Sequence, residues 1–127
     1  MLGIVNLGVN NIRSIYYKLE KSKVEYKIVS SPEDFKGISK IILPGVGNFG
    51  KAMNRIDELN IREILVDFAT NKKIPFLGIC LGMQLMTRGS EEAPGVNGLG
   101  IVDADTIKFS FEDNSLKIPH VGWNNII

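Results

Sequence analysis

The sequence is poor in the features that mark secreted, membrane and nucleic-acid-binding proteins. It has one cysteine, which excludes an internal disulfide framework and fits a reducing compartment such as the cytoplasm. Its 15 basic and 14 acidic residues leave a net charge of +1, which gives no electrostatic argument for a nucleic acid or an anionic membrane as partner. No apolar run approaches the length of a membrane span. We therefore expect a cytoplasmic globular protein of one domain, residues 1–127.

Short apolar runs alternate with helical periodicity over the first 90 residues, the pattern of an α/β fold with a doubly wound, mostly parallel sheet and helices on both faces. Strands are predicted at residues 2–5, 24–28, 41–43 and 75–80, with the second near the sheet edge. Helices are predicted from residue 12, at 32–35 and from 51, with helical periodicity that continues to about residue 71. Beyond residue 90 the character changes, and residues 99–102, 106–111 and 116–118 are predicted to form hairpins.

The only cysteine, Cys80, lies where a buried strand is expected to enter a helix through a tight turn. Gly78 and Gly82 flank it, which is typical of a nucleophile elbow because Cβ atoms there would clash at a sharp bend. Unpaired N–H groups at the first turn of a helix favour negative charge beside the sulfur. A lone cysteine is more often a small buried hydrophobe, but a cysteine that only fills a core needs no flanking glycines. The motif favours a nucleophile.

A second glycine-rich stretch, Pro44 to Gly50, follows the central strand. Glycines there let a backbone approach a ligand and turn its N–H groups toward it, although tight turns alone would also explain them. The stretch has no Gly-Lys-Ser/Thr ending and does not read Gly-x-Gly-x-x-Gly, so it matches neither phosphate-binding fingerprint. Ligands bind beyond the carboxyl ends of parallel strands, and this rule brings the stretch and Cys80 to the same edge of the sheet.

Together, Pro44 to Gly50 and Gly78 to Gln84 closely resemble the class I (triad) glutamine amidotransferases. The tail from Pro119 to Asn124 and the loop from Ser90 to Gly95 are similar to one branch of that family, the glutaminases that serve imidazole glycerol phosphate synthesis in histidine biosynthesis. The resemblance implies a flavodoxin-like fold. It covers the amino-terminal part of the family domain, so we expect a sheet that is incomplete at its carboxyl end.

The resemblance also implies a reaction, in which a cysteine attacks the carboxamide carbon of glutamine, ammonia leaves, and water hydrolyses the thioester to glutamate. Cys80 matches the nucleophile. Positions that hold the glutamine substrate match Gly45, Gln84 and Glu92, and positions whose N–H groups bind the oxyanion match Val46, Gly47 and Leu81. The family passes its ammonia to a cyclase or synthase subunit with a (β/α)8 barrel. No cofactor or metal is implied.

Two departures from the family pattern keep alternatives open. The family's first loop usually reads Gly-x-Gly-Asn after an Asp-Tyr pair, whereas this chain has Asn6-Leu7 followed by Gly8-Val9-Asn10-Asn11. A paralogous subunit that supplies ammonia for surface-sugar amidation is therefore the alternative pathway. The family's base, a histidine followed two residues later by a glutamate, has no counterpart among residues 1–127.

The only histidine, His120, matches a family segment near the partner interface, as do Trp123 and Asn124. No acid follows His120 at the spacing that the triad needs, so we expect an interface or structural role for it. The chain is therefore predicted to be a glutaminase truncated at its carboxyl end and inactive by itself. A non-catalytic binding module with the same fold is the competing interpretation.

Overall fold

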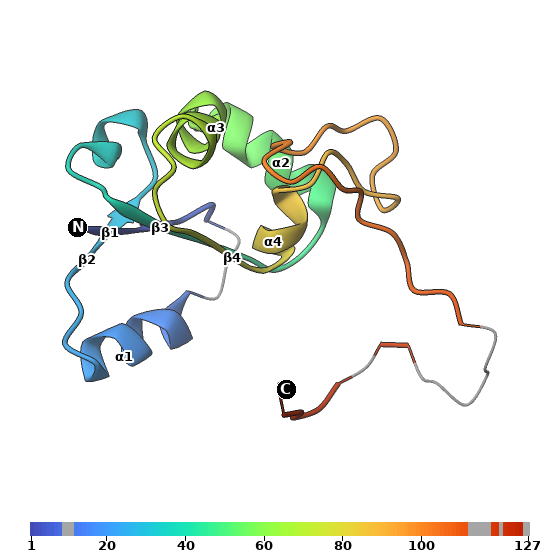
Figure 1. Ribbon diagram of the computed structural model, residues 1–127, viewed down its shortest axis with the longest axis horizontal. Coiled ribbons are helices and arrows are strands. Elements are labelled where there is room, and N and C mark those ends of the chain that lie inside the picture. The colour runs from blue at the N-terminus through green and yellow to red at the C-terminus, as the bar shows by residue number, and fades with distance from the viewer. Residues whose placement is uncertain (9–11, 112–117, 120, 126–127) are drawn as a thin grey trace.

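Four parallel strands form the centre of the computed structural model, which describes residues 1–8, 12–111, 118–119 and 121–125 (Figure 1). Their order in the sheet is β2-β1-β3-β4. The strands are β1 (Leu2–Val5), β2 (Tyr26–Val29), β3 (Lys40–Gly45) and β4 (Phe76–Cys80). All four predicted strands are confirmed, and β2 lies at the sheet edge, as expected from its alternating pattern.

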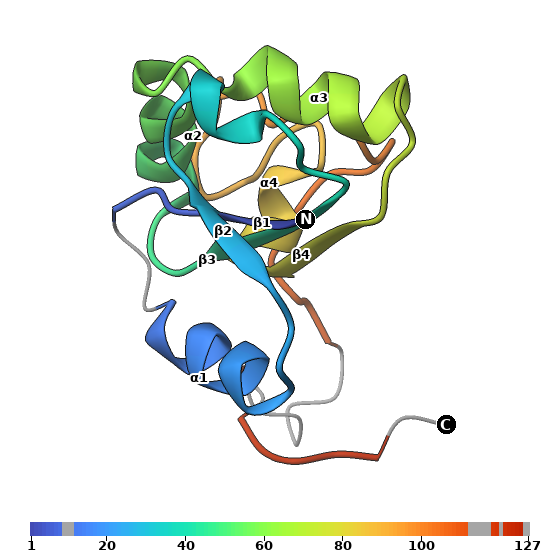
Figure 2. The same cartoon turned by 90° about the vertical axis from the view of Figure 1, so that its left-hand side faces the viewer.

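Helices lie on both faces of this sheet. Figure 2 shows α1 (Arg13–Lys21) on one side and α2 (Phe49–Glu58) and α3 (Arg62–Thr70) on the other, which confirms the doubly wound prediction. A 3-10 helix, η1 (Pro32–Phe35), links β2 to β3, and the short helix α4 (Leu81–Leu85) follows β4. In the described parts of the chain, no helix is long and apolar enough to cross a membrane.

The helix after the glycine-rich stretch begins two residues earlier than its periodicity predicts. The side chain of Asn48 accepts a hydrogen bond from the Lys51 backbone N–H at 3.0 Å, and this cap lets α2 start at Phe49. The predicted periodicity continues without a break, but the structure divides it into two helices, because Asn60 has a φ of +55° and separates α2 from α3.

The core lies between the sheet and the pair α2 and α3. Ile41 and Leu43 of β3 are at most 1% exposed and belong to the same buried cluster as Met53, Ile56 and Leu65. Burial of each such side chain stabilises the fold by roughly 1.5 to 3 kcal/mol.

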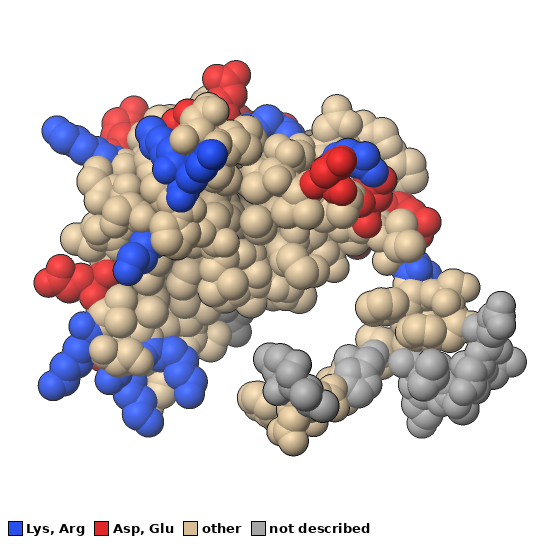
Figure 3. Space-filling model, in the orientation of Figure 1, with Lys and Arg blue, Asp and Glu red and all other residues tan. Residues whose placement is uncertain are grey.

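The opposite face of the sheet is less well covered. No residue of α1 is buried, and Leu77 and Ile79 of β4 stay 54% and 38% exposed. Figure 3 shows basic side chains gathered at the α1 end of the molecule, where Lys18 and Lys21 are exposed. These lysines form the solvated helix face that their spacing predicts.

The predicted hairpins beyond residue 90 are wrong in the described part of the chain. Residues 99–102 and 106–111 form no strand with each other, and the segment pairs only through isolated bridges, Gly89 with Asn97 and Ser90 with Thr106. The physical reason is that its backbone groups bond back to the turn after α4: Arg88 donates to the Ala104 carbonyl at 2.9 Å and Glu91 to the Thr106 carbonyl at 3.0 Å. Residues 116–117 of the third predicted strand lie outside the described residues.

Helix α4 packs unusually close to the carboxyl ends of β3 and β4. A Cβ atom on Gly45 would lie 2.6 Å from the backbone nitrogen of Gly82, and one on Gly78 would lie 2.5 Å from the Cα of Met83. A Cβ on Gly82 would overlap the carbonyl oxygen of Leu43. The glycines that suggested an elbow are therefore required by the contact of a helix with two strands.

We predict that Gly82→Ala strongly destabilises the fold, because the new methyl group meets backbone rather than a side chain that can rotate away. The cost is expected to reach or exceed about 3 kcal/mol, the upper range for overpacking. Urea denaturation followed by circular dichroism measures it.

The matched control is Gly89→Ala, where the nearest atom to the new Cβ is the Val96 carbonyl oxygen at an ordinary 3.5 Å. Equal unfolding midpoints for the two variants would contradict the close packing of α4.

Candidate functional site

Cys80 is the last residue of β4 and directly precedes α4. Its φ of +54° and ψ of −121° are unusual for a residue with a side chain, and such a conformation costs about 1 to 3 kcal/mol. It pairs in register with Gly45 of β3, so the two strands end side by side. The side chain is exposed. These are the properties of a nucleophile elbow, and the small buried hydrophobe is ruled out.

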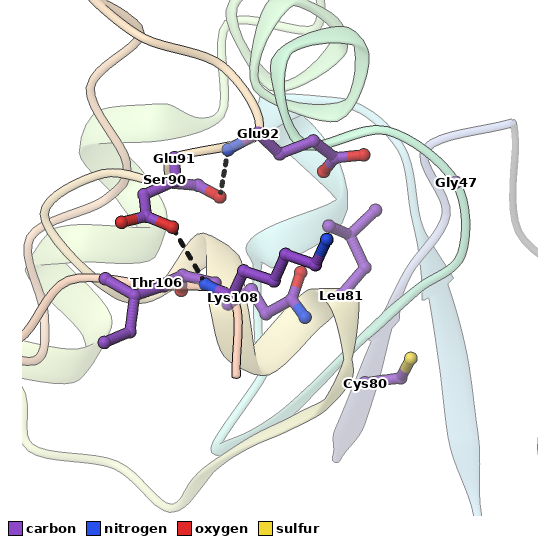
Figure 4. Close-up of a pocket in the computed structure, with 10 residues that line it drawn as sticks. Gly47, Cys80, Leu81, Ser90, Glu91, Glu92, Thr106 and Lys108 are labelled. Carbon is purple, nitrogen blue, oxygen red and sulfur yellow. Dashed lines mark hydrogen bonds between the residues drawn. The ribbon is translucent and has the colours of Figure 1, made fainter. Parts of the chain in front are cut away.

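A cavity of about 600 Å³ opens beside Cys80, large enough for a small ligand (Figure 4). It brings together five of the residues predicted from sequence, which come from the glycine-rich stretch, the elbow, α4 and the following loop. Its lining consists of Gly47, Cys80, Leu81, Gln84, Ser90, Glu91, Glu92, Thr106, Ile107 and Lys108.

The remaining predicted site residues lie outside this lining. Gly45 is buried under α4, where it makes room for the helix. Val46 is 46% exposed on the loop that follows β3. Trp123 is fully exposed in the tail and Asn124 is exposed as well, while His120 lies outside the described residues.

Five lining residues were not predicted as site residues from the sequence: Ser90, Glu91, Thr106, Ile107 and Lys108. The Glu91 carboxylate accepts a hydrogen bond from the Lys108 backbone N–H at 3.0 Å, and the Thr106 N–H donates to the Gly89 carbonyl at 2.9 Å. Residues 106–108 therefore reach the cavity by pairing with the loop after α4. No local sequence signal marks this pairing, because the partners are about 17 residues apart.

Arg88 lies at the base of this loop. Its guanidinium forms ion pairs with Asp105 at 2.6 Å and Asp103 at 2.8 Å. The hydrogen bond and charge of Asp105, followed by the charge of Asp103, raise the pKa of Arg88 above its usual range. These ion pairs are exposed, and the turn that leads into Thr106 is held by backbone hydrogen bonds, from the Arg88 N–H to the Ala104 carbonyl and from the Thr106 N–H to the Gly89 carbonyl, each at 2.9 Å.

Glu92 joins the loop to the glycine-rich stretch. One carboxylate oxygen accepts a hydrogen bond from the Phe49 backbone N–H at 3.0 Å, at the first residue of α2, and the Glu92 N–H donates to the Ser90 hydroxyl at 3.2 Å. A carboxylate at a helix amino terminus is stabilised by the unpaired N–H groups there. Glu92 therefore supports the site wall besides lining the cavity.

The cavity offers an exposed thiol, backbone N–H groups at a strand-to-helix turn, a side-chain amide and charges of both signs. Such a set suits attack on a carbonyl carbon and binding of a small polar molecule. Within the described residues, no group of three or more histidine, cysteine, aspartate or glutamate side chains could hold a metal ion.

A family model described as "Glutamine amidotransferase class-I" matches residues 4–125. Among curated proteins, the imidazole glycerol phosphate synthase subunit HisH of Leptospira borgpetersenii is 42% identical over 128 residues, covering 99% of this chain and 62% of its own length. The same subunit of Methanocaldococcus jannaschii is 42% identical, and the match covers 99% of this chain and 61% of that protein. The subunit of Bacillus subtilis is 37% identical, and the match covers 99% of this chain and 60% of that protein. The chain thus spans about three fifths of these relatives.

A solved structure described as a crystal structure of glutamine amidotransferase superposes on this chain with a TM-score of 0.72. The match covers 89% of this chain and 59% of the other, at 19% sequence identity. At that identity the likeness establishes a shared fold, and it confirms the predicted fold class.

We predict that Glu92→Ala lowers the free energy of unfolding by about 1 kcal/mol, because the Phe49 N–H loses its partner at the start of α2. Glu92→Gln keeps an acceptor oxygen and should lose less. Urea titration of the variants measures both values.

Glu25→Ala removes an exposed carboxylate remote from the site and is the control. An unfolding free energy for Glu92→Ala equal to that of the control would show that the bond to Phe49 does not stabilise the loop.

Proposed function

The chain belongs to the class I glutamine amidotransferase family, and from this premise we propose that it carries the glutaminase chemistry of that family. One observation carries the proposal: Cys80 sits on a sharp elbow in the cavity that Gln84 and Glu92 also line. We further propose that residues 1–127 act as part of a single domain, since the family model spans residues 4–125. The reaction is placed in the cytoplasm, where a free cysteine stays reduced.

In the proposed reaction, the Cys80 sulfur attacks the carboxamide carbon of glutamine. The C–N bond breaks, the proton of the Cys80 thiol passes to the leaving nitrogen, which departs as ammonia, and a thioester to Cys80 remains. Water then attacks the thioester, which releases glutamate and returns the thiol. The Leu81 N–H lies next in the chain after the nucleophile and is proposed to stabilise the oxyanion, together with an N–H group of Val46 or Gly47.

Gln84 and Glu92 are proposed to hold the substrate. Gln84 is one turn beyond Cys80 on α4 and lines the cavity, while Glu92 reaches it from the loop. Gly45 is proposed to contribute indirectly, because its missing side chain lets α4 bring Leu81 to the end of β3.

The ammonia is proposed to pass to a partner subunit, a cyclase or synthase with a (β/α)8 barrel. Support comes from the curated relatives, whose names place them as subunits of imidazole glycerol phosphate synthase. His120, Trp123 and Asn124 are the proposed contacts, and the full exposure of Trp123 suits a residue that is covered by another protein. The alternative acceptor is a surface-sugar amidating enzyme, favoured by the departure at Asn6-Leu7 from the family pattern.

Residues 1–127 contain no histidine followed two residues later by a glutamate, so the triad base has no match in this sequence. We therefore predict that the purified 127-residue chain shows essentially no steady-state glutamate release. General acid–base groups contribute about 10² to 10⁴ in rate, and the members of a triad act as a unit. Glutamate release would be measured with and without the partner, against Cys80→Ala.

Turnover at an ordinary enzymatic rate, abolished in Cys80→Ala, would contradict this prediction. It would identify a base within these residues, and His120 would be the first candidate. The binding-module alternative predicts neither turnover nor labelling by a glutamine analogue.

Labelling is therefore the sharper test of the site. A chloroketone analogue of L-glutamine needs no acid, since the Cys80 sulfur displaces chloride directly. We predict saturable labelling of Cys80 and a decrease of about threefold to tenfold for Gln84→Leu, the range expected for one lost hydrogen bond. Mass spectrometry of the modified chain measures the rate.

Met83→Leu is the matched control, because Met83 lies beside Gln84 on α4 but is 57% exposed and outside the cavity lining. An unchanged rate for Gln84→Leu would remove Gln84 from the substrate site.

A further inference from the structure

Lys108 supplies the only positive charge among the described residues that line the cavity. Its backbone is fixed by the hydrogen bond from its N–H to the Glu91 carboxylate at 3.0 Å. Figure 4 shows its side chain extending across the cavity, with the ammonium group toward Leu81. No described residue forms a hydrogen bond or an ion pair with that ammonium group.

Two carboxylates line the same cavity, and each has a bond to the backbone. Glu91 accepts from the Lys108 N–H and Glu92 accepts from the Phe49 N–H, so each carboxylate has one oxygen engaged by the protein. The cavity thus combines two carboxylates that accept backbone hydrogen bonds with one ammonium group that has no hydrogen-bond or ion-pair partner among the described residues. A ligand with both an ammonium and a carboxylate group complements this arrangement, whereas a simple anion or cation complements only half of it.

We propose that Lys108 binds the α-carboxylate of the glutamine whose side-chain amide reacts at Cys80. This inference rests on the proposed glutaminase function and adds a specificity residue to it. Lys108 would select free glutamine over glutamine whose α-carboxylate is masked, because only the free amino acid offers an anion to the ammonium group. Lys108 takes no part in bond breaking and acts on substrate binding alone.

The inference is tested by the rate at which Cys80 is alkylated by three reagents. The first is the chloroketone analogue of L-glutamine, the second is the same molecule with a carboxamide in place of the α-carboxylate, and the third is iodoacetamide. In each case the sulfur forms a bond to carbon and a halide ion leaves. Wild type is compared with Lys108→Met, Lys108→Arg and the control Lys40→Met. Lys40 is exposed and is the first residue of β3, at the end of the strand opposite to the one that carries the site.

We expect Lys108→Met to lower the rate with the carboxylate reagent by about tenfold, the lower range for a hydrogen bond to a charged group. The rates with the carboxamide reagent and with iodoacetamide should not change, and Lys108→Arg should keep most of the wild-type rate. Lys40→Met should behave as wild type with all three reagents. Unchanged iodoacetamide rates also show that the thiol itself is unaffected.

A Lys108→Met rate equal to wild type with the carboxylate reagent would overturn the inference and leave the glutaminase proposal standing. Equal wild-type rates with the carboxylate and carboxamide reagents would overturn it as well. If neither chloroketone labels wild type in a saturable manner, the glutaminase proposal fails and the role of Lys108 fails with it.

Discussion

The close contact between α4 and the ends of β3 and β4 is the constraint on which the site depends. Cys80 leaves the sheet at a left-handed backbone angle, which costs about 1 to 3 kcal/mol. Leu81 and Leu85 of α4 are 3% and 0% exposed, and burial of two such side chains stabilises the fold by roughly 3 to 6 kcal/mol. The burial of α4 therefore outweighs the strain at the elbow, but only while Gly82 lets the helix reach the strands.

The second part of the site is held by different forces. Residues 88–108 are joined to α4 by backbone hydrogen bonds, such as that from the Leu99 N–H to the Leu85 carbonyl at 2.8 Å, and by the buried side chain of Leu99. The ion pairs of Arg88 are exposed, and screening by solvent makes such pairs weak. Arg62 adds a hydrogen bond to the Gly98 carbonyl at 2.8 Å, and the hydrogen bond from Arg62 lowers the pKa of Asp57. The wall that carries Lys108 therefore depends on a few backbone bonds, while Cys80 is held by the packing of α4 against the core.

The fold of the first 80 residues was predictable because its signals are local. An apolar run such as Ile41 to Leu43 indicates a strand buried on both faces. The glycines around Cys80 indicate a helix that contacts a sheet closely. The start of α2 was placed two residues late, since the Asn48 cap acts through a side chain rather than through apolar periodicity. The strands, most of the helix bounds and the elbow at Cys80 follow from patterns shorter than a dozen residues.

Residues 106–111 show why the rest was not predictable. Ile107, Phe109 and Phe111 alternate with polar residues as in a half-buried strand, yet they are 67%, 69% and 45% exposed. Alternation indicates that a segment can form a strand, but a strand also needs a second segment to pair with. Here the backbone around Thr106 forms its hydrogen bonds and its isolated bridge with Gly89, Ser90 and Glu91 instead of forming a hairpin.

The charged residues of the cavity were also not predictable from local sequence patterns. Glu91 and Lys108 lie 17 residues apart and meet only through tertiary pairing, whereas Cys80 and its glycines are neighbours in the chain. A nucleophile elbow can therefore be predicted from the sequence, because its geometry is set by adjacent residues. Groups that recognise the charged ends of a substrate must stand farther from the reacting atom than one turn reaches, so they come from separate segments. Only the folded chain brings them to the same cavity.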